Sequence, residues 1–252
     1  MLAITRITVR EGLRKKQLYL FVGIAAFMIL VLLSPGNIRW DDGKITEPRL
    51  IAQIGLWMTL VFTSFLAVFV SMNAIGSEVE RGSTHLALVR PVSRARFWLE
   101  RWLGVTALAW LNAVLMLGAL MVSLGLKFGP AASKLVLPGW LLFPLPVACL
   151  TALVTVINTR LASALAGFGG IAAALFGFFR GQLGIVADAG SGLHAWVARF
   201  LVWFSPPLNR VVSQVFRMDG GGGLDFWVLH ECLLYVYVAA AVGLLLFSRR
   251  EI

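Results

Sequence analysis

The side chains that could bind a metal ion or act as nucleophiles are few and far apart in the chain. There are three histidines, His85, His194 and His230, and two cysteines, Cys149 and Cys232. The cysteines lie in or beside apolar runs and form neither a disulfide framework nor a metal cluster. The motifs G-x-x-x-x-G-K-[ST], H-E-x-x-H, C-x-x-C and G-x-S-x-G are absent from the sequence. We therefore expect no catalytic residue, no bound cofactor and no metal site in this chain, with only a His194/His230 pair left open as metal ligands.

One carboxylate, Glu231, lies within an otherwise uncharged apolar run, with His230 beside it. Ionisable residues inside a membrane commonly mark ion or proton paths. Glu231 lies near the outer end of its run, where water reaches it, so an interfacial charge is the favoured interpretation and a proton relay is the alternative. Because the other apolar runs hold no carboxylate, any energy for transport is expected to come from a source other than a proton gradient.

The composition is that of a membrane protein. Of the 252 residues, 59% are hydrophobic and only 13% are charged, about half the share of soluble proteins. A soluble domain of this length could not cover so much apolar surface, which excludes both an ordinary globular domain and intrinsic disorder. The net charge of +10 comes from basic residues beside apolar runs, where they meet anionic headgroups and set the topology. We therefore expect membrane lipid, and no nucleic acid, among the partners.

Six apolar runs predict six transmembrane helices in a single domain over residues 1–252, because a helix needs roughly 20 apolar residues to cross a bilayer. The runs cover residues 18–33, 50–75, 102–126, 135–157, 161–179 and 227–247. With the N-terminus inside, the inner segments hold 13 Lys and Arg residues and the longer outer segments hold 9. The inner segments are 1–17, 76–101, 158–160 and 248–252, and the outer ones are 35–49, 127–134 and 180–226. The positive-inside rule then predicts an all-α integral membrane protein with both termini in the cytoplasm.

The N-terminal segment 1–17 is expected to form an interfacial helix, here called the elbow. Arg6, Arg10 and Arg14 recur every four residues and so share one face of a helix. Such a helix lies in the plane of the membrane surface with its cations at the headgroups. A frayed charged tail is the alternative.

The outer segment 180–226 is rich in Trp, Phe, Val and Leu and predicts short helices between spans five and six. Ser191 is expected to cap the first of them, and Pro206-Pro207 to separate it from the next. These helices either dip into the edge of the bilayer as a re-entrant segment or form an aromatic belt at its surface.

Residues 76–101 form the one sizeable inner segment within the chain. A helical turn with Glu78 and Glu80 is followed by a break and a short apolar turn. Pro91 then fixes a bend, and Ser93 is placed to cap the helix of the third span. A small apolar helix ringed by charge is typical of a docking surface for a soluble partner. A plain basic loop that only sets the topology is the alternative.

This inner segment closely resembles a signature of the six-span permease subunits of ABC transporters, in the type-2 exporter class. Members of that class read roughly E-x-E-x-G-T, then L-x-x-P-V-S-R, then K-x-x-G after their second span. The matching residues are Glu78, Glu80, Arg81, Gly82, Thr84, Leu88, Pro91, Val92, Ser93, Arg94 and Gly104, with Arg101 in place of the usual Lys. The stretches T-V-R-E-G-L-R-K-K near the start and F-S-R-R-E-I at the end resemble the elbow and the inner terminus of the family.

The resemblance implies the membrane half of an ATP-driven exporter in the bacterial cytoplasmic (inner) membrane. Two permease chains, identical or different, would form the pathway at their interface. Two separate ABC ATP-binding subunits would hold ATP and Mg²⁺ beneath them, and this chain would hydrolyse no ATP. The segment 78–94 would carry the closure of those subunits to the spans, with partner-coupling roles for Glu78, Glu80, Arg81, Gly82, Thr84, Leu88, Pro91, Ser93 and Arg94.

The direction and cargo of transport stay open at this stage. An apolar or amphipathic substrate is favoured by the Trp and Phe content, although the same rings suit contact with lipid. Two other classes of protein are the alternatives. One is a non-transporting membrane anchor or scaffold of an envelope complex, and the other is an intramembrane enzyme, for which the sequence offers no catalytic dyad.

Overall fold

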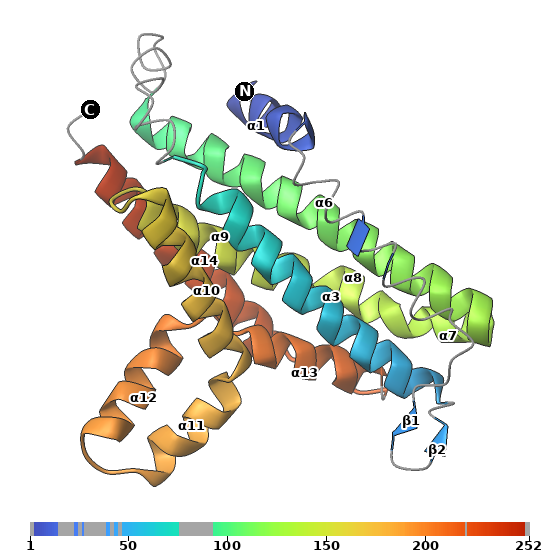
Figure 1. Cartoon of the computed structure of the whole chain (residues 1–252). Coiled ribbons are helices and arrows are strands. Elements are labelled where there is room, and N and C mark those ends of the chain that lie inside the picture. Colours follow the sequence, from blue (N-terminus) through green and yellow to red (C-terminus); the bar gives the residue numbers. More distant parts are fainter. Residues whose placement is uncertain are drawn as a thin grey trace.

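The structure is a computed structural model that describes residues 3–14, 23–24, 27, 39–40, 43–44, 47–75, 93–219 and 221–249. The regular structure in this part of the chain is helical, apart from one antiparallel pair of two-residue strands (Figure 1). The elements in chain order are α1 (Ala3–Arg14), β1 (Arg39–Trp40), β2 (Gly43–Lys44), α3 (Pro48–Ser71), α6 (Arg94–Phe128), α7 (Pro130–Ser133), the 3-10 turn η1 (Lys134–Val136), α8 (Leu137–Leu142), α9 (Pro144–Asn158), α10 (Ser163–Phe178), α11 (Arg180–Ala189), α12 (Leu193–Phe204), α13 (Leu208–Asp219) and α14 (Phe226–Ser248).

Four helical stretches of the described residues are long and apolar enough to cross a membrane: α3, α6, the run from α7 to α9, and α14. The pair α10 and α11, bent by 70°, makes a fifth if it is counted as one span. These stretches correspond to five of the six predicted spans, so a helical membrane protein is confirmed. The first predicted span, 18–33, falls almost wholly outside the described residues, and the count of six stays a prediction.

Prolines and short turns divide the helices where the sequence indicates breaks. α8 ends at Leu142 and α9 begins at Pro144, whose ring nitrogen has no hydrogen to donate. Pro206 and Pro207 separate α12 from α13, as predicted. The predicted cap at Ser191 is wrong, because the residue before α12 is Gly192, and no side chain caps that helix.

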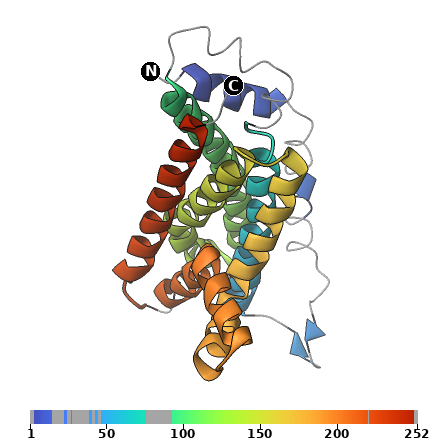
Figure 2. The same cartoon turned by 90° about the vertical axis from the view of Figure 1, so that its left-hand side faces the viewer.

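The predicted outer segment forms a hairpin of α11 and α12 followed by α13. The hairpin projects from the bundle at the end opposite α1 (Figures 1 and 2). α13 packs against α8 and α10. Its apolar side chains at Leu208, Val211, Val212 and Val215 are all buried in the core. Burial of this face holds the outer segment to the bundle, since apolar burial is worth about 25 cal/mol per Å².

The end of the bundle near α1 gathers all the described parts of the predicted inner segments. α3 ends there, α6 begins there, and the turn between α9 and α10 and the end of α14 lie there as well (Figures 1 and 2). The predicted outer segments 127–134 and 180–226 lie toward the other end. The alternation of inner and outer segments predicted from the sequence therefore agrees with the fold.

Candidate coupling region

The predicted coupling segment begins and ends at the α1 end of the bundle. Two of its predicted partner-coupling residues, Ser93 and Arg94, are among the described residues. The other seven lie outside them: Glu78, Glu80, Arg81, Gly82, Thr84, Leu88 and Pro91. What the structure describes is how the chain is held at residues 75 and 93, on either side of residues 76–92, the part of the segment that lies outside the described residues.

The leading side of the segment is anchored by Asn158. The backbone N–H of Ile75 donates to Asn158 Oδ1 over 3.0 Å, and both residues are fully buried. Asn158 is the last residue of α9, so this bond fixes the chain just after α3 to the end of α9. A buried N–H without its acceptor would cost about 1–3 kcal/mol, which makes this a firm attachment.

The trailing side is anchored at the start of α6. Ser93 Oγ accepts a hydrogen bond from Arg96 N, which confirms the predicted cap of this helix. The next residue, Arg94, donates from Nη1 to the carbonyl oxygen of Ser248 over 3.3 Å. Arg160 donates in the same way to Leu246 O over 3.1 Å. Two arginines thus hold carbonyl groups at the C-terminal end of α14, where cations are favoured by the helix dipole.

Aromatic packing reinforces the contact between the start of α6 and the end of α14. The rings of Phe97 and Phe247 stack with centroids 5.9 Å apart, and both side chains are buried. Trp98 is fully buried against Gly243, where an added Cβ would come within 2.3 Å of the indole ring. The absence of a side chain at residue 243 is therefore what allows α14 to approach Trp98.

The helix α1 is attached to α6 through the buried carboxylate of Glu100. Its Oε2 accepts from the backbone N–H of Ile4 over 3.0 Å, and its backbone oxygen accepts from Thr5 Oγ1 over 2.9 Å. Arg96 donates from Nε to the other carboxylate oxygen, Oε1, over 2.8 Å. Ile4 lies in the first turn of α1, so Glu100 places a negative charge at the positive end of that helix.

Arg101, the residue after Glu100 in α6, makes a further polar contact with α1 at Thr8, one turn beyond Ile4. Its Nη1 donates to Thr8 Oγ1 over 2.8 Å and lies 3.8 Å from a carboxylate oxygen of Glu11. Close approach is possible because both helices carry glycine here. An added Cβ at Gly104 would meet Thr8 at 2.7 Å, and one at Gly12 would meet Leu108 at 2.2 Å.

The contacts of α1 define which of its faces is free. Thr8 is buried against α6, whereas the predicted elbow residues Arg6 and Arg10 are exposed. The side chain of the third one, Arg14, is outside the described residues. A helix is thus present where the elbow was predicted, and its position at a membrane surface remains a proposal.

A second polar cluster, at the opposite end of the molecule, was missed by the sequence reasoning. Glu231 Oε1 lies 2.6 Å from Arg180 Nη2, and its Oε2 lies 2.7 Å from Arg210 Nη1. Glu231 is therefore an ion-paired residue that links α14 to α11 and α13. The only sequence signal for this was the presence of four arginines in the outer segment.

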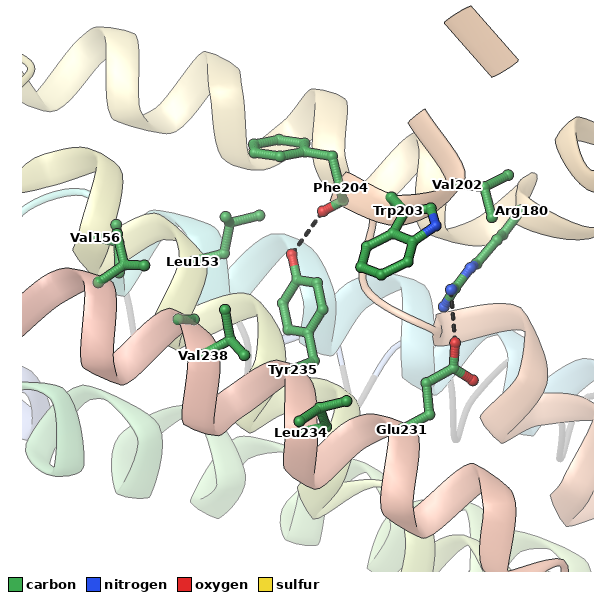
Figure 3. Close-up of a pocket in the computed structure, with 12 residues that line it drawn as sticks. Leu153, Val156, Arg180, Val202, Trp203, Phe204, Glu231, Leu234, Tyr235 and Val238 are labelled. Atoms are coloured by element: carbon green, nitrogen blue, oxygen red, sulfur yellow. Dashed lines mark hydrogen bonds and ion pairs between the residues drawn. The ribbon is translucent and has the colours of Figure 1, made fainter. Parts of the chain in front are cut away.

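Beside this cluster lies an apolar groove of about 600 Å³ between α9, α12 and α14 (Figure 3). Arg180 and Glu231 lie at one end of it, and Val156 and Val238 lie at the other. Tyr235 crosses the groove and donates to the backbone oxygen of Phe204 over 2.7 Å. The groove brings together segments that are 80 residues apart in the sequence.

The part of the chain that the structure describes contains no cluster of side chains suited to a metal-binding site. None of its His, Cys, Asp and Glu side chains form a group of three or more that could hold a metal ion. The class of protein that this fold defines is a multi-pass helical membrane protein whose polar residues join helices to one another.

Comparison with known families gives this class a name. The model of a family described as ABC-2 family transporter protein matches residues 41–248, which is most of the chain. The chain therefore belongs to the ABC-2 transporter family, and the resemblance of its inner segment to type-2 permeases is confirmed. It is a membrane component of the ABC transporter class. No curated protein matches the chain.

Proposed function

We propose that the chain is the permease subunit of an ATP-driven exporter and that the segment 78–94 couples it to a separate ATP-binding subunit. Membership of the ABC-2 family supports the permease role. One observation carries the coupling role: the chain on both sides of residues 76–92 is tied to the same end of the bundle. Ile75 is bonded to Asn158, and Arg94 is bonded to Ser248.

These ties give the segment a mechanical function. A force on residues 76–92 acts on α3 and α6 together, because neither side of the segment can move without its hydrogen-bonded partner. α6 in turn holds α1 through Glu100 and α14 through Phe97. A partner that moves the segment would therefore rotate the packed helices as one body, which is a common form of domain motion.

The proposed assembly has two permease chains, identical or different, above two ATP-binding subunits in the bacterial inner membrane. The cytoplasmic face would be the α1 end of the bundle, where Arg6, Arg10, Arg94 and Arg160 are exposed to meet anionic headgroups or the partner. An apolar or amphipathic cargo is favoured by the high content of Trp and Phe in the chain.

The test is co-expression of the full chain with an ATP-binding protein encoded beside it. We expect the two proteins to purify as one complex that hydrolyses ATP. Replacing Glu80 with alanine is expected to lower ATP turnover of the complex, or retention of the partner, about tenfold, because a charge-assisted contact at the interface is lost. Melting temperature and elution volume of the permease alone are expected to stay unchanged.

The matched control is Glu47→Ala. Glu47 precedes α3 at the end opposite Ile75 and Ser93, and its carboxylate makes no capping bond. Loss of a carboxylate there is expected to leave both partner retention and turnover as in the wild type. Equal behaviour of the two variants would contradict the coupling role. A stable complex whose ATP hydrolysis does not respond to any amphiphile would favour a membrane anchor instead.

A further inference from the structure

The groove between α9, α12 and α14 has the build of a binding site for an amphiphile. Its walls are apolar side chains, among them Leu153, Val202, Leu234 and Val242. Trp203, on its rim, is 85% exposed, so the groove opens at the outer surface of the bundle. In a membrane protein such a surface faces hydrocarbon, and a groove there is filled by an apolar chain rather than by water.

One end of the groove is polar and belongs to a cluster with a net positive charge, of which Arg180 and Glu231 line the groove and Arg210 lies outside it. Two guanidinium groups, Arg180 and Arg210, face the single carboxylate of Glu231. Nη2 of Arg180 forms an ion pair with that carboxylate, while its buried Nη1 has no hydrogen-bond partner among the described residues. An unmatched positive charge and a buried unpaired donor both favour an anionic oxygen as the missing partner.

We propose that this groove holds one anionic phospholipid of the surrounding bilayer. The phosphate would lie at Arg180, and an acyl chain would run past Tyr235 toward Val242. Trp203 would cover the chain close to the headgroup, a depth at which tryptophan is commonly found. The proposal rests on the chain being a membrane protein and is independent of how it couples to ATP hydrolysis.

The length of the groove agrees with this occupant. Glu231 and Val242 are eleven residues apart on α14, which is about 16 Å along a helix with a rise of about 1.5 Å per residue. One leaflet contributes about half of the roughly 30 Å of hydrocarbon in a bilayer. A phosphate at the Arg180 end therefore puts the acyl chain along the depth of a single leaflet, the one nearer to the α11–α12 hairpin.

The test uses the full chain purified in detergent and incubated with palmitoyl-oleoyl phosphatidylglycerol or with the matching phosphatidylcholine. Native mass spectrometry is expected to show one phosphatidylglycerol bound about tenfold more tightly than phosphatidylcholine, as one charge-assisted hydrogen bond allows. Arg180→Gln is expected to remove this preference. Arg217→Gln, which removes the same charge from a largely exposed ion pair with Asp225 outside the groove, is expected to keep it.

A second measurement covers the case in which Arg180→Gln fails to fold. Phosphatidylglycerol with a photoreactive group at the end of its acyl chain is expected to label the segments around Val156 and Val242. Labelling confined to other helices, or a groove filled by a second copy of the chain in the assembled transporter, would overturn the proposal. So would release of the bound lipid during ATP turnover, since that outcome identifies it as cargo rather than a resident lipid.

Discussion

Replacing Glu100 with leucine is expected to detach α1 from the bundle. The carboxylate is buried and serves two donors, the N–H of Ile4 and the side chain of Arg96. Arg96 is half exposed and can turn to water, whereas the first turn of α1 loses both an acceptor and a favourable charge. Loss of a hydrogen bond to a charged group costs about 1.5–3 kcal/mol. A free helix of twelve residues is marginal in water, so α1 is expected to fray once it is released.

Hydrogen exchange followed by mass spectrometry measures this release directly. Amides in residues 3–14 are expected to exchange about 10 to 100 times faster in Glu100→Leu than in the wild type, which corresponds to the same free energy. Glu100→Gln keeps an acceptor for the N–H of Ile4, so its exchange rates are expected to lie between those of the wild type and Glu100→Leu. The control is Glu11→Leu, whose carboxylate is mostly exposed and 3.8 Å from Arg101, a kind of ion pair worth about 0–1 kcal/mol. Equal protection of α1 in Glu100→Leu and the wild type would show that the helix is held by its other contacts.

The positions of the apolar helices among the described residues could be predicted from the sequence because they depend on local composition. Apolar runs, the prolines at residues 144 and 206 and the cap at Ser93 each act within a few residues. The bend between α10 and α11 is an example of a feature whose long-range contacts could not be predicted in this way. The apolar run stops at Phe179, but the 70° turn there also brings Arg180 to Glu231, which lies 51 residues further along the chain.

The polar contacts between helices could not be predicted, since each joins residues far apart in the sequence. Glu100 seemed part of a basic inner segment, and its bond to Ile4 spans 96 residues. Asn158 seemed part of a tight turn, and its bond to Ile75 spans 83 residues. The residues next to such a side chain in the sequence do not distinguish it from an exposed one. The family resemblance could be read from the sequence, because it is carried by residues close together in the chain, from Glu78 to Gly104.

α10 is rich in glycine, a residue that allows the backbones of neighbouring helices to approach closely. An added Cβ at Gly167, Gly170 or Gly177 would come within 3 Å of a neighbouring atom, and Gly170 faces two helices at once. α10 lies against both α3 and α9. An added Cβ at Gly170 would come within 2.5 Å of Val154 on α9 and 2.8 Å of Val68 on α3. Both valines are fully buried, so neither can turn aside into open space.

Gly170→Leu is therefore expected to destabilise the packing of α10 strongly. Inserting methylenes into a packed core typically costs about 1–3 kcal/mol, and leucine at this position collides with two helices at once. We expect a clear fall in melting temperature in detergent and faster hydrogen exchange across residues 163–178. Gly184→Leu is the matched control, because no atom lies within 4 Å of a Cβ at that position in α11. If the two leucine variants melt alike, α10 does not pack against α3 and α9 as closely as these distances require.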